Sequence, residues 1–181
     1  MNPSIDKLLA SLTTRFSLSD ITEQREDLVF VTVRKEQLVS VLTHLRDTEG
    51  FSHFVLLSAV DWIEDNVFQL SYIVNHPQKH TDVVLRVLID REDAVMESAH
   101  HLWKQIATYQ RELFEMYGIS FPGSPRVDEA FILEGWDDKP PMRRDFDTKK
   151  YSEETYFPRP GRETKDPKEH MKNKLYPDAD K

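Results

Sequence analysis

The sequence contains no cysteine and only five glycines among 181 residues. Without cysteine, the chain has no disulfides, no cysteine ligands for zinc or iron–sulfur clusters, and no thiol nucleophile. Neither a GxGxxG motif nor a P-loop is present, and no serine lies in a GxSxG motif. No apolar run approaches the roughly 20 residues of a membrane-spanning helix. These absences predict a chain with no catalytic centre, no redox group and no membrane span of its own, located in the cytoplasm.

A basic surface is also missing, because the formal net charge is −8. Nucleic-acid binding proteins typically carry a basic patch, so a nucleic-acid partner is not expected. The charge is unevenly distributed. Residues 147–181 hold 9 basic and 8 acidic residues, which leaves 15 basic and 24 acidic residues in 1–146. The sequence therefore combines an acidic body with a nearly neutral C-terminal segment.

The hydrophobic pattern predicts helices and strands in the order of an α+β domain. Apolar residues at helical spacing predict helices after a Ser4 cap and over 35–46, with a stop at Gly50. β-branched and aromatic runs, mostly with period two, predict strands. The predicted strands are Leu28–Val33, His53–Ala59, Val67–Val74 and Thr81–Ile89. The continuous apolar run of His53–Ala59 favours a strand buried on both faces. We expect a mixed or antiparallel sheet with helices packed on one face and an extended C-terminal tail.

Residues 94–117 carry two adjacent apolar stripes at helical spacing. One stripe includes Leu102 and Leu113, and the other includes Trp103 and Phe114. An amphipathic surface helix needs only one such stripe. The pattern predicts a helix over 94–117, with a break near Thr108 as an alternative. Its two stripes predict that it is buried around much of its girth, either by its own domain or by a second protein. Gly118 is expected to end it.

Histidines and acidic residues offer two candidates for chemistry. His76 and His80 have the helical spacing of metal ligands, but Pro77 lies between them in a polar loop with no third ligand. Asp61, Glu64 and Asp65 gather at a turn, where carboxylates could serve acid–base catalysis. A solvated hairpin tip predicts the same residues, and we favour that interpretation. A free-standing enzyme using this turn and the histidines is the remaining catalytic alternative, which mutation of Asp61 and His76 together would test.

Residues 121–146 alternate loop-forming prolines and glycines with large apolar side chains, and they end in Arg143, Arg144, Asp145 and Phe146. Such a strip suits docking to another protein, since arginine is favoured in interface ion pairs. Residues 147–181 contain only seven apolar residues and four prolines, too little apolar surface to fold alone. We therefore divide the chain into a core domain over 1–120, a docking strip over 121–146 and a partner-wrapping tail over 147–181.

The docking strip and the helix before it carry a resemblance to a known family. The run Arg111-Glu112, the segment Glu115–Ile119, and Phe121, Gly123 and Pro125 occur in the order of a family signature. Trp136 and the segment Pro141–Phe146 follow in order. The sequence resembles the C subunit of NADH:quinone oxidoreductase (respiratory complex I), the 30 kDa subunit family, over roughly residues 30–146. Ser124 stands where that family usually has histidine.

The resemblance implies an α+β subunit of the peripheral arm, on the cytoplasmic side of the bacterial inner membrane, that carries no cofactor and no catalytic residue. NADH, FMN, iron–sulfur clusters and quinone would belong to partner subunits. The implied partners are the hydrogenase-like subunit of the quinone site and the neighbouring iron–sulfur subunits. Related subunits occur in membrane-bound [NiFe] hydrogenases and in ferredoxin- or F420-dependent enzymes, which stay open as alternatives. The residues expected at the partner interface are Arg111, Glu112, Tyr117, Phe121, Trp136, Arg143, Arg144, Asp145 and Phe146.

Overall fold

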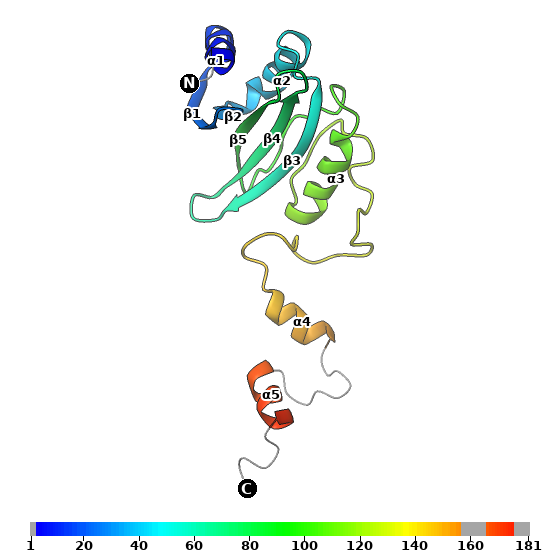
Figure 1. Ribbon diagram of the computed structural model, residues 1–181. Helices are drawn as coiled ribbons and strands as arrows, with labels where there is room; N and C mark the ends of the chain where they lie inside the picture. The colour runs from blue at the N-terminus through cyan, green and yellow to red at the C-terminus, as the bar shows by residue number, and fades with distance from the viewer. Residues whose placement is uncertain (1–2, 157–165, 176–181) are drawn as a thin grey trace. The chain divides into compact units, whose positions relative to one another are not determined.

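A computed structural model describes residues 3–156 and 166–175 and divides the chain into two compact units, residues 1–144 and 145–181. The first unit holds a five-stranded sheet with three α-helices and one 3₁₀ turn (Figure 1). Its elements are α1 (Pro3–Arg15), β1 (Leu18–Arg25), β2 (Leu28–Val33), η1 (Lys35–Gln37), α2 (Leu38–Asp47), β3 (His53–Trp62), β4 (Val67–His76), β5 (Thr81–Asp90) and α3 (Ile106–Tyr117).

The strands lie in the order β1-β2-β5-β4-β3. β3, β4 and β5 form the predicted antiparallel meander, and β2 pairs with β5 in parallel, so the predicted mixed sheet is confirmed. β1 pairs antiparallel with β2 at the sheet edge and was not predicted. Its sequence, LSDITEQR, lacks apolar alternation because most of its side chains are exposed. Backbone pairing with β2, interrupted by register shifts, holds it in place.

The core lies on one face of the sheet, as the period-two patterns require. One row of paired residues crosses four strands through Val29, Val83, Val74 and Phe54. Buried side chains of α1, α2 and α3 join the same apolar cluster, including Leu12, Leu42 and Ile106. The prediction that helices pack on one face is therefore confirmed. The opposite face leaves Val60, Trp62 and Leu88 between 41% and 50% exposed.

Strand β3 lies at the edge of the sheet and exposes side chains on one of its faces, so the prediction that it is buried on both faces is wrong. Ser58 is exposed, whereas Phe54 and Leu57 are buried. The apolar run is continuous because a register shift between Phe54 and Leu56 interrupts the alternation. α3 runs beside this strand (Figure 1). Its Tyr109 and Tyr117 hydroxyls each donate to a β3 carbonyl, at 3.2 Å, which occupies acceptors that an edge strand otherwise leaves open.

Helix α3 begins at Ile106 and ends at Tyr117, so the predicted helix over 94–117 is too long by twelve residues. In the segment before α3, the backbone forms hydrogen bonds with the residues that follow the helix. The amide of Met96 donates to Ser120 O, and the amide of Ser120 donates to Ala94 O. Its apolar residues Met96 and Ala99 are buried without being helical. Periodicity alone cannot distinguish this buried irregular segment from a helix.

The second unit contains two short helices, α4 (Thr148–Tyr156) and α5 (Pro167–Leu175). No residue of α4 is buried, and Tyr156, Met171 and Leu175 are 56%, 48% and 59% exposed. The prediction of an extended tail did not anticipate these helices, while the low apolar content agrees with their exposure. In the described parts of the chain, no helix is both long and apolar enough to cross a membrane.

Candidate functional site: a clamped strip after helix α3

The strip begins where Gly118 ends α3 in a left-handed conformation, with φ of +73°. Its amide donates back to carbonyls of the last helical turn, as in a common C-terminal cap. A side chain at this position would also lack room. A Cβ atom would lie 3.2 Å from Arg143 Nη2 and 3.3 Å from Pro140 Cγ. Glycine therefore permits both the turn and the return of the strip against the end of the helix.

The first residues of the strip are part of the core. Ile119 and Phe121 are completely buried, and Ser120 forms a parallel bridge with Val95. Phe121 was predicted at a partner interface, and its side chain is enclosed by its own domain in this structure. The strip is therefore anchored at its start, and the chain as far as Arg144 belongs to the first unit.

Glu115 of α3 holds the middle of the strip. Its Oε2 accepts a hydrogen bond from the amide of Phe131 at 2.6 Å. Its Oε1 accepts from the amides of Ile132 and Leu133 at 2.9 and 3.1 Å. Hydrogen bonds to a carboxylate are stronger than neutral ones, and three to one group fix the local backbone. Arg111, one helical turn earlier, places its guanidinium 5.3 Å from the ring of Phe131.

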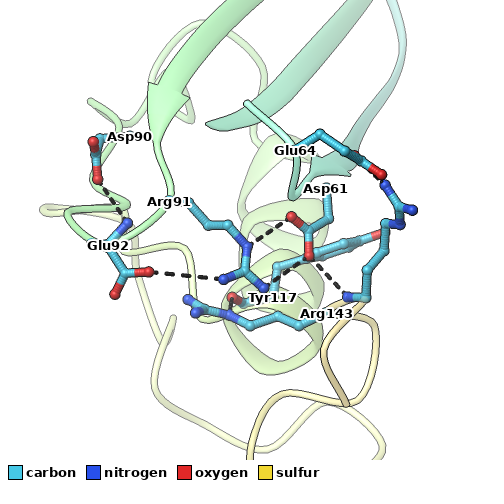
Figure 2. Close-up of polar contacts among 8 residues, drawn as sticks. Asp61, Glu64, Asp90, Arg91, Glu92, Tyr117 and Arg143 are labelled. Carbon is cyan, nitrogen blue, oxygen red and sulfur yellow. Dashed lines mark hydrogen bonds and ion pairs between the residues drawn. The ribbon is translucent and has the colours of Figure 1, made fainter. Parts of the chain in front are cut away.

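A buried ion pair lies at the end of the sheet (Figure 2). Asp61 on β3 is 1% exposed at its side chain, and Arg91, which follows β5, is 7% exposed. Arg91 Nε donates to Asp61 Oδ1 at 2.8 Å, and Nη2 donates to Oδ2 at 3.2 Å. The expectation that Asp61 lies in a solvated hairpin tip is therefore wrong. In the β3–β4 register it pairs with Phe68 on the core face, where only a charged partner makes its burial tolerable.

The end of the strip closes onto this ion pair (Figure 2). The amide of Arg144 donates to Asp61 Oδ2 at 2.9 Å, and its Nη1 pairs with Glu64 Oε2 at 2.5 Å. Arg143 Nε donates to Tyr117 O at 2.7 Å, while its guanidinium lies 5.2 Å from the ring of Phe68. We call these contacts of Arg143 and Arg144 the clamp. Four segments distant in sequence thus meet at one point.

The titration of two groups reflects the clamp. The hydrogen bond from Arg144 lowers the pKa of Glu64 below its ordinary value, with a smaller contribution from a backbone hydrogen bond. Burial raises the pKa of the Tyr117 phenol, and the negative charges of Asp61 and Glu112 raise it further. Both shifts favour the state already present at neutral pH, namely an ionised Glu64 and a neutral Tyr117.

The remaining predicted interface residues lie around this framework. Glu112 is half-buried on α3. Trp136, within the strip, donates its indole N–H to Asp138 O and Lys139 O at 3.0 and 3.1 Å. Asp145 and Phe146 belong to the second unit, where the Phe146 ring lies 5.6 Å from that of Tyr151. Whether these side chains contact a partner stays a prediction.

No catalytic arrangement emerges from the groups that the sequence offered. His76 ends β4, is buried, and packs edge-on against Phe51. Among the described residues, no three His, Asp or Glu side chains gather closely enough to hold a metal ion. Asp61 and Glu64, two of the three carboxylates considered for acid–base catalysis, are each engaged by an arginine.

A serine, a histidine and a glutamate do meet between α1 and α2, where no sequence motif indicated a site. Ser11 Oγ donates to Glu49 Oε1 at 2.5 Å and lies 3.4 Å from His44 Nε2. Glu49 Oε1 lies 3.3 Å from the same ring nitrogen. A Ser-His-acid triad needs the acid on the other ring nitrogen. This cluster therefore joins α1 to the end of α2 rather than activating Ser11.

Comparison with known proteins identifies the family. Residues 31–152 match the family model described as "Respiratory-chain NADH dehydrogenase, 30 Kd subunit". This chain belongs to that family. The match includes α3, the strip and the clamp, so the resemblance read from the sequence is confirmed.

Curated members of the family cover different shares of this chain. The C subunit of NADH-quinone oxidoreductase from Citrifermentans bemidjiense is 30% identical over 145 residues, which are 78% of this chain and 88% of that protein. The corresponding C subunit from Moorella thermoacetica is 28% identical over 120 residues, 66% of this chain and 80% of that protein. The C/D subunit of Pseudomonas aeruginosa is 25% identical over 77% of this chain, and the chain spans only a quarter of its length.

Two solved structures share the fold. A chain of the membrane-bound sulfane sulfur reductase, an archaeal respiratory membrane complex, superposes with a TM-score of 0.75 at 21% identity, covering 83% of this chain and 90% of that one. A trypsin-resistant fragment of Nqo5 superposes with a TM-score of 0.58 at 18% identity, covering 67% of this chain and 98% of the fragment. These likenesses confirm the α+β fold of 30 kDa subunits.

Proposed function

We propose that this chain is a non-catalytic scaffold in the peripheral arm of a complex I-type NADH:quinone oxidoreductase, on the cytoplasmic side of a bacterial inner membrane. In this proposal it holds the hydrogenase-like subunit of the quinone site and the neighbouring iron–sulfur subunits, and it carries no redox cofactor itself. Electron transfer and the proton translocation coupled to it take place in those partners.

The clamped strip is the observation that supports a scaffold. The strip forms no regular secondary structure, but its backbone is fixed by the burial of Phe121, by hydrogen bonds to Glu115 of α3 and by the clamp. Arg143 and Arg144 use their side chains within the chain itself, which orients the segment rather than reacting with a substrate. A surface loop fixed so extensively presents a constant shape, and preorganisation of that kind favours binding to another protein.

Purification of the tagged chain from membranes of its own host tests the proposal. We expect it to retrieve a quinone-site subunit and iron–sulfur subunits in fixed proportion, whereas the isolated chain contains no iron and has no visible absorption. Recovery of the chain alone, from membranes that retain quinone reduction by NADH, would contradict it. The electron-input subunit that co-purifies decides between complex I, where it binds flavin and NADH, and the hydrogenase, ferredoxin or F420 alternatives.

Charge reversal in the clamp tests the scaffold role separately from chemistry. We expect Arg143→Glu with Arg144→Glu to reduce the amount of assembled complex while turnover per assembled complex stays unchanged. Native gels stained for activity, calibrated against the amount of this chain in the band, measure both quantities. A normal amount of complex with slow turnover would instead assign the arginines to the quinone reaction.

A further inference from the structure

A groove of about 350 Å³ runs between β3 and α3. Its floor consists of Leu57 and Leu113, which are 3% and 4% exposed. Ile132 and Met142 of the strip form its outer wall, and they are 68% and 55% exposed. Contiguous apolar surface of this kind, open to water on an otherwise acidic body, marks an interaction site more often than chance exposure does.

The backbone that carries the two exposed side chains is held in position by hydrogen bonds. The amide of Ile132 donates to Glu115, and the amide of Met142 donates to Met116 O at 3.0 Å. Tyr117 lines the same groove, and its hydroxyl is fixed on Ala59 O. The groove therefore has a preformed apolar wall, and a ligand would not have to order it on binding.

Glu112 supplies the only carboxylate among the described residues that line the groove. It is half-buried, and within residues 3–156 and 166–175 its carboxylate makes no hydrogen bond or ion pair. A partly desolvated carboxylate at the edge of an apolar surface is most favourable when a cation meets it. The groove is therefore complementary to a ligand that carries an apolar side chain with a positive charge beside it.

We propose that this groove binds a segment of a partner subunit that inserts an apolar side chain against Ile132 and Met142 and pairs an arginine or lysine with Glu112. The inference rests on the proposed function and names the surface by which the scaffold holds a neighbour. Charge complementarity selects the occupant, because the body that surrounds the groove has a net charge of −9 over residues 1–146.

Site-specific cross-linking in the assembled complex tests the location and the chemistry together. A photo-reactive benzoylphenylalanine replaces Ile132 in the tagged chain, and the matched control carries it at Leu88, which is 50% exposed on the open sheet face. We expect position 132 to cross-link to a peptide of another subunit with an arginine or lysine within a few residues. Position 88 should yield little or none. Cross-linking at 88 but not 132, or to a second copy of this chain, would overturn the inference.

Substitutions in the groove, with one control outside it, give a quantitative test. Ile132→Asp should lower the partner subunits recovered per tagged chain about tenfold, and Leu88→Asp should leave them unchanged. Glu112→Lys should also lower recovery, and reversing the cross-linked basic residue to glutamate should restore it. Equal losses from Ile132→Asp and Leu88→Asp, with both isolated variants folded, would overturn the inference. If Ile132→Asp fails to fold, the cross-link at position 132 and the Glu112 charge swap still test whether the groove binds the partner.

The outcomes separate this inference from the function on which it rests. Recovery of the wild-type chain without membrane partners would overturn the proposed function and the groove assignment together. A complete complex in which position 132 does not react, and in which Glu112→Lys assembles normally, would overturn the groove assignment alone.

Discussion

While excluded from water, Asp61 accepts hydrogen bonds from Nε and Nη2 of Arg91 and from the backbone amide of Arg144. Asp61→Ala should therefore lower the free energy of unfolding by about 3–5 kcal/mol, because the Arg91 charge would stay buried without its partner. Urea unfolding of the isolated chain, followed by circular dichroism, measures the loss.

The exposed pair Arg25–Asp27 provides the control. Arg25 Nε lies 3.2 Å from Asp27 Oδ1, and the two side chains are 61% and 54% exposed. Asp27→Ala should therefore lower the free energy of unfolding by only about 0–1 kcal/mol. The double variant Asp61→Ala, Arg91→Met should lose much less unfolding free energy than the losses of the two single variants added together, because neither charge is left buried without a partner. Additive losses would contradict a coupled buried pair.

Only part of this residue-level picture can be predicted from the sequence. Asp61 follows Leu57 and Ala59 at period two, which was a signal that it faces the core. Phe54 also faces the core, but the register shift in β3 places it out of step with this alternation. The sequence of the strand therefore looked uniformly apolar. Arg91 lies thirty residues away and Arg144 eighty-three, and no local pattern links them. Acidic residues at a hairpin therefore predicted solvent exposure.

At the scale of elements, the end of α3 depends on Gly118. Gly118→Ala adds a Cβ atom at a φ of +73° and within 3.3 Å of the strip, whereas Gly123→Ala adds one at +81° with nothing within 4 Å. In both variants the free energy of unfolding should fall by about 1–2 kcal/mol, because alanine is strained in the left-handed backbone conformation. Gly118→Ala should lose roughly 1 kcal/mol more from overpacking. Thermal unfolding of the two variants measures the difference, and equal losses would contradict the close contact.

The contact between the strip and the β3–β4 turn should depend on pH. Arg144 lowers the pKa of Glu64 from an ordinary value of 4.5. A lowered folded-state pKa means that the ion pair contributes stability above that ordinary value and loses it as pH falls through the lowered one. Acidification from pH 6 should thus destabilise the wild type more steeply below about pH 4.5 than Glu64→Gln. Parallel curves would mean that the pair contributes nothing.

Elements with strong periodicity were predicted well, and elements held by tertiary contacts were not. β2 matches its predicted bounds, and β4 and β5 extend theirs by one or two residues. β1 was missed because its sequence is mostly polar and it joins the sheet mainly through backbone pairing with β2. The stripes over 94–105 belong to a partly buried irregular segment, in which Ser98 donates to the buried Gln110 at 2.7 Å. Such long-range polar contacts leave no periodic trace in a sequence.

At the scale of the whole molecule, the clamp lies at the end of the first unit. Arg144 is the last residue of the first unit, and it is bound at both its backbone amide and its guanidinium. The chain that follows has exposed helices with few apolar side chains. In the proposed scaffold, a fixed starting point reduces the conformational freedom that such a tail loses on binding a partner.

A charge swap across the clamp separates its internal role from a direct contact with a partner. Arg144→Glu should reduce assembly, because it places a like charge beside Glu64 and next to the buried Asp61. Adding Glu64→Arg restores one attractive pair at the same position, so the double variant should recover most of the assembled complex on native gels. Glu64→Ala alone should have a small effect, since the pair is exposed and the backbone bond to Asp61 remains. If the double variant stays unassembled while its isolated chain folds normally, the guanidinium of Arg144 must also bind another subunit, as the sequence predicted.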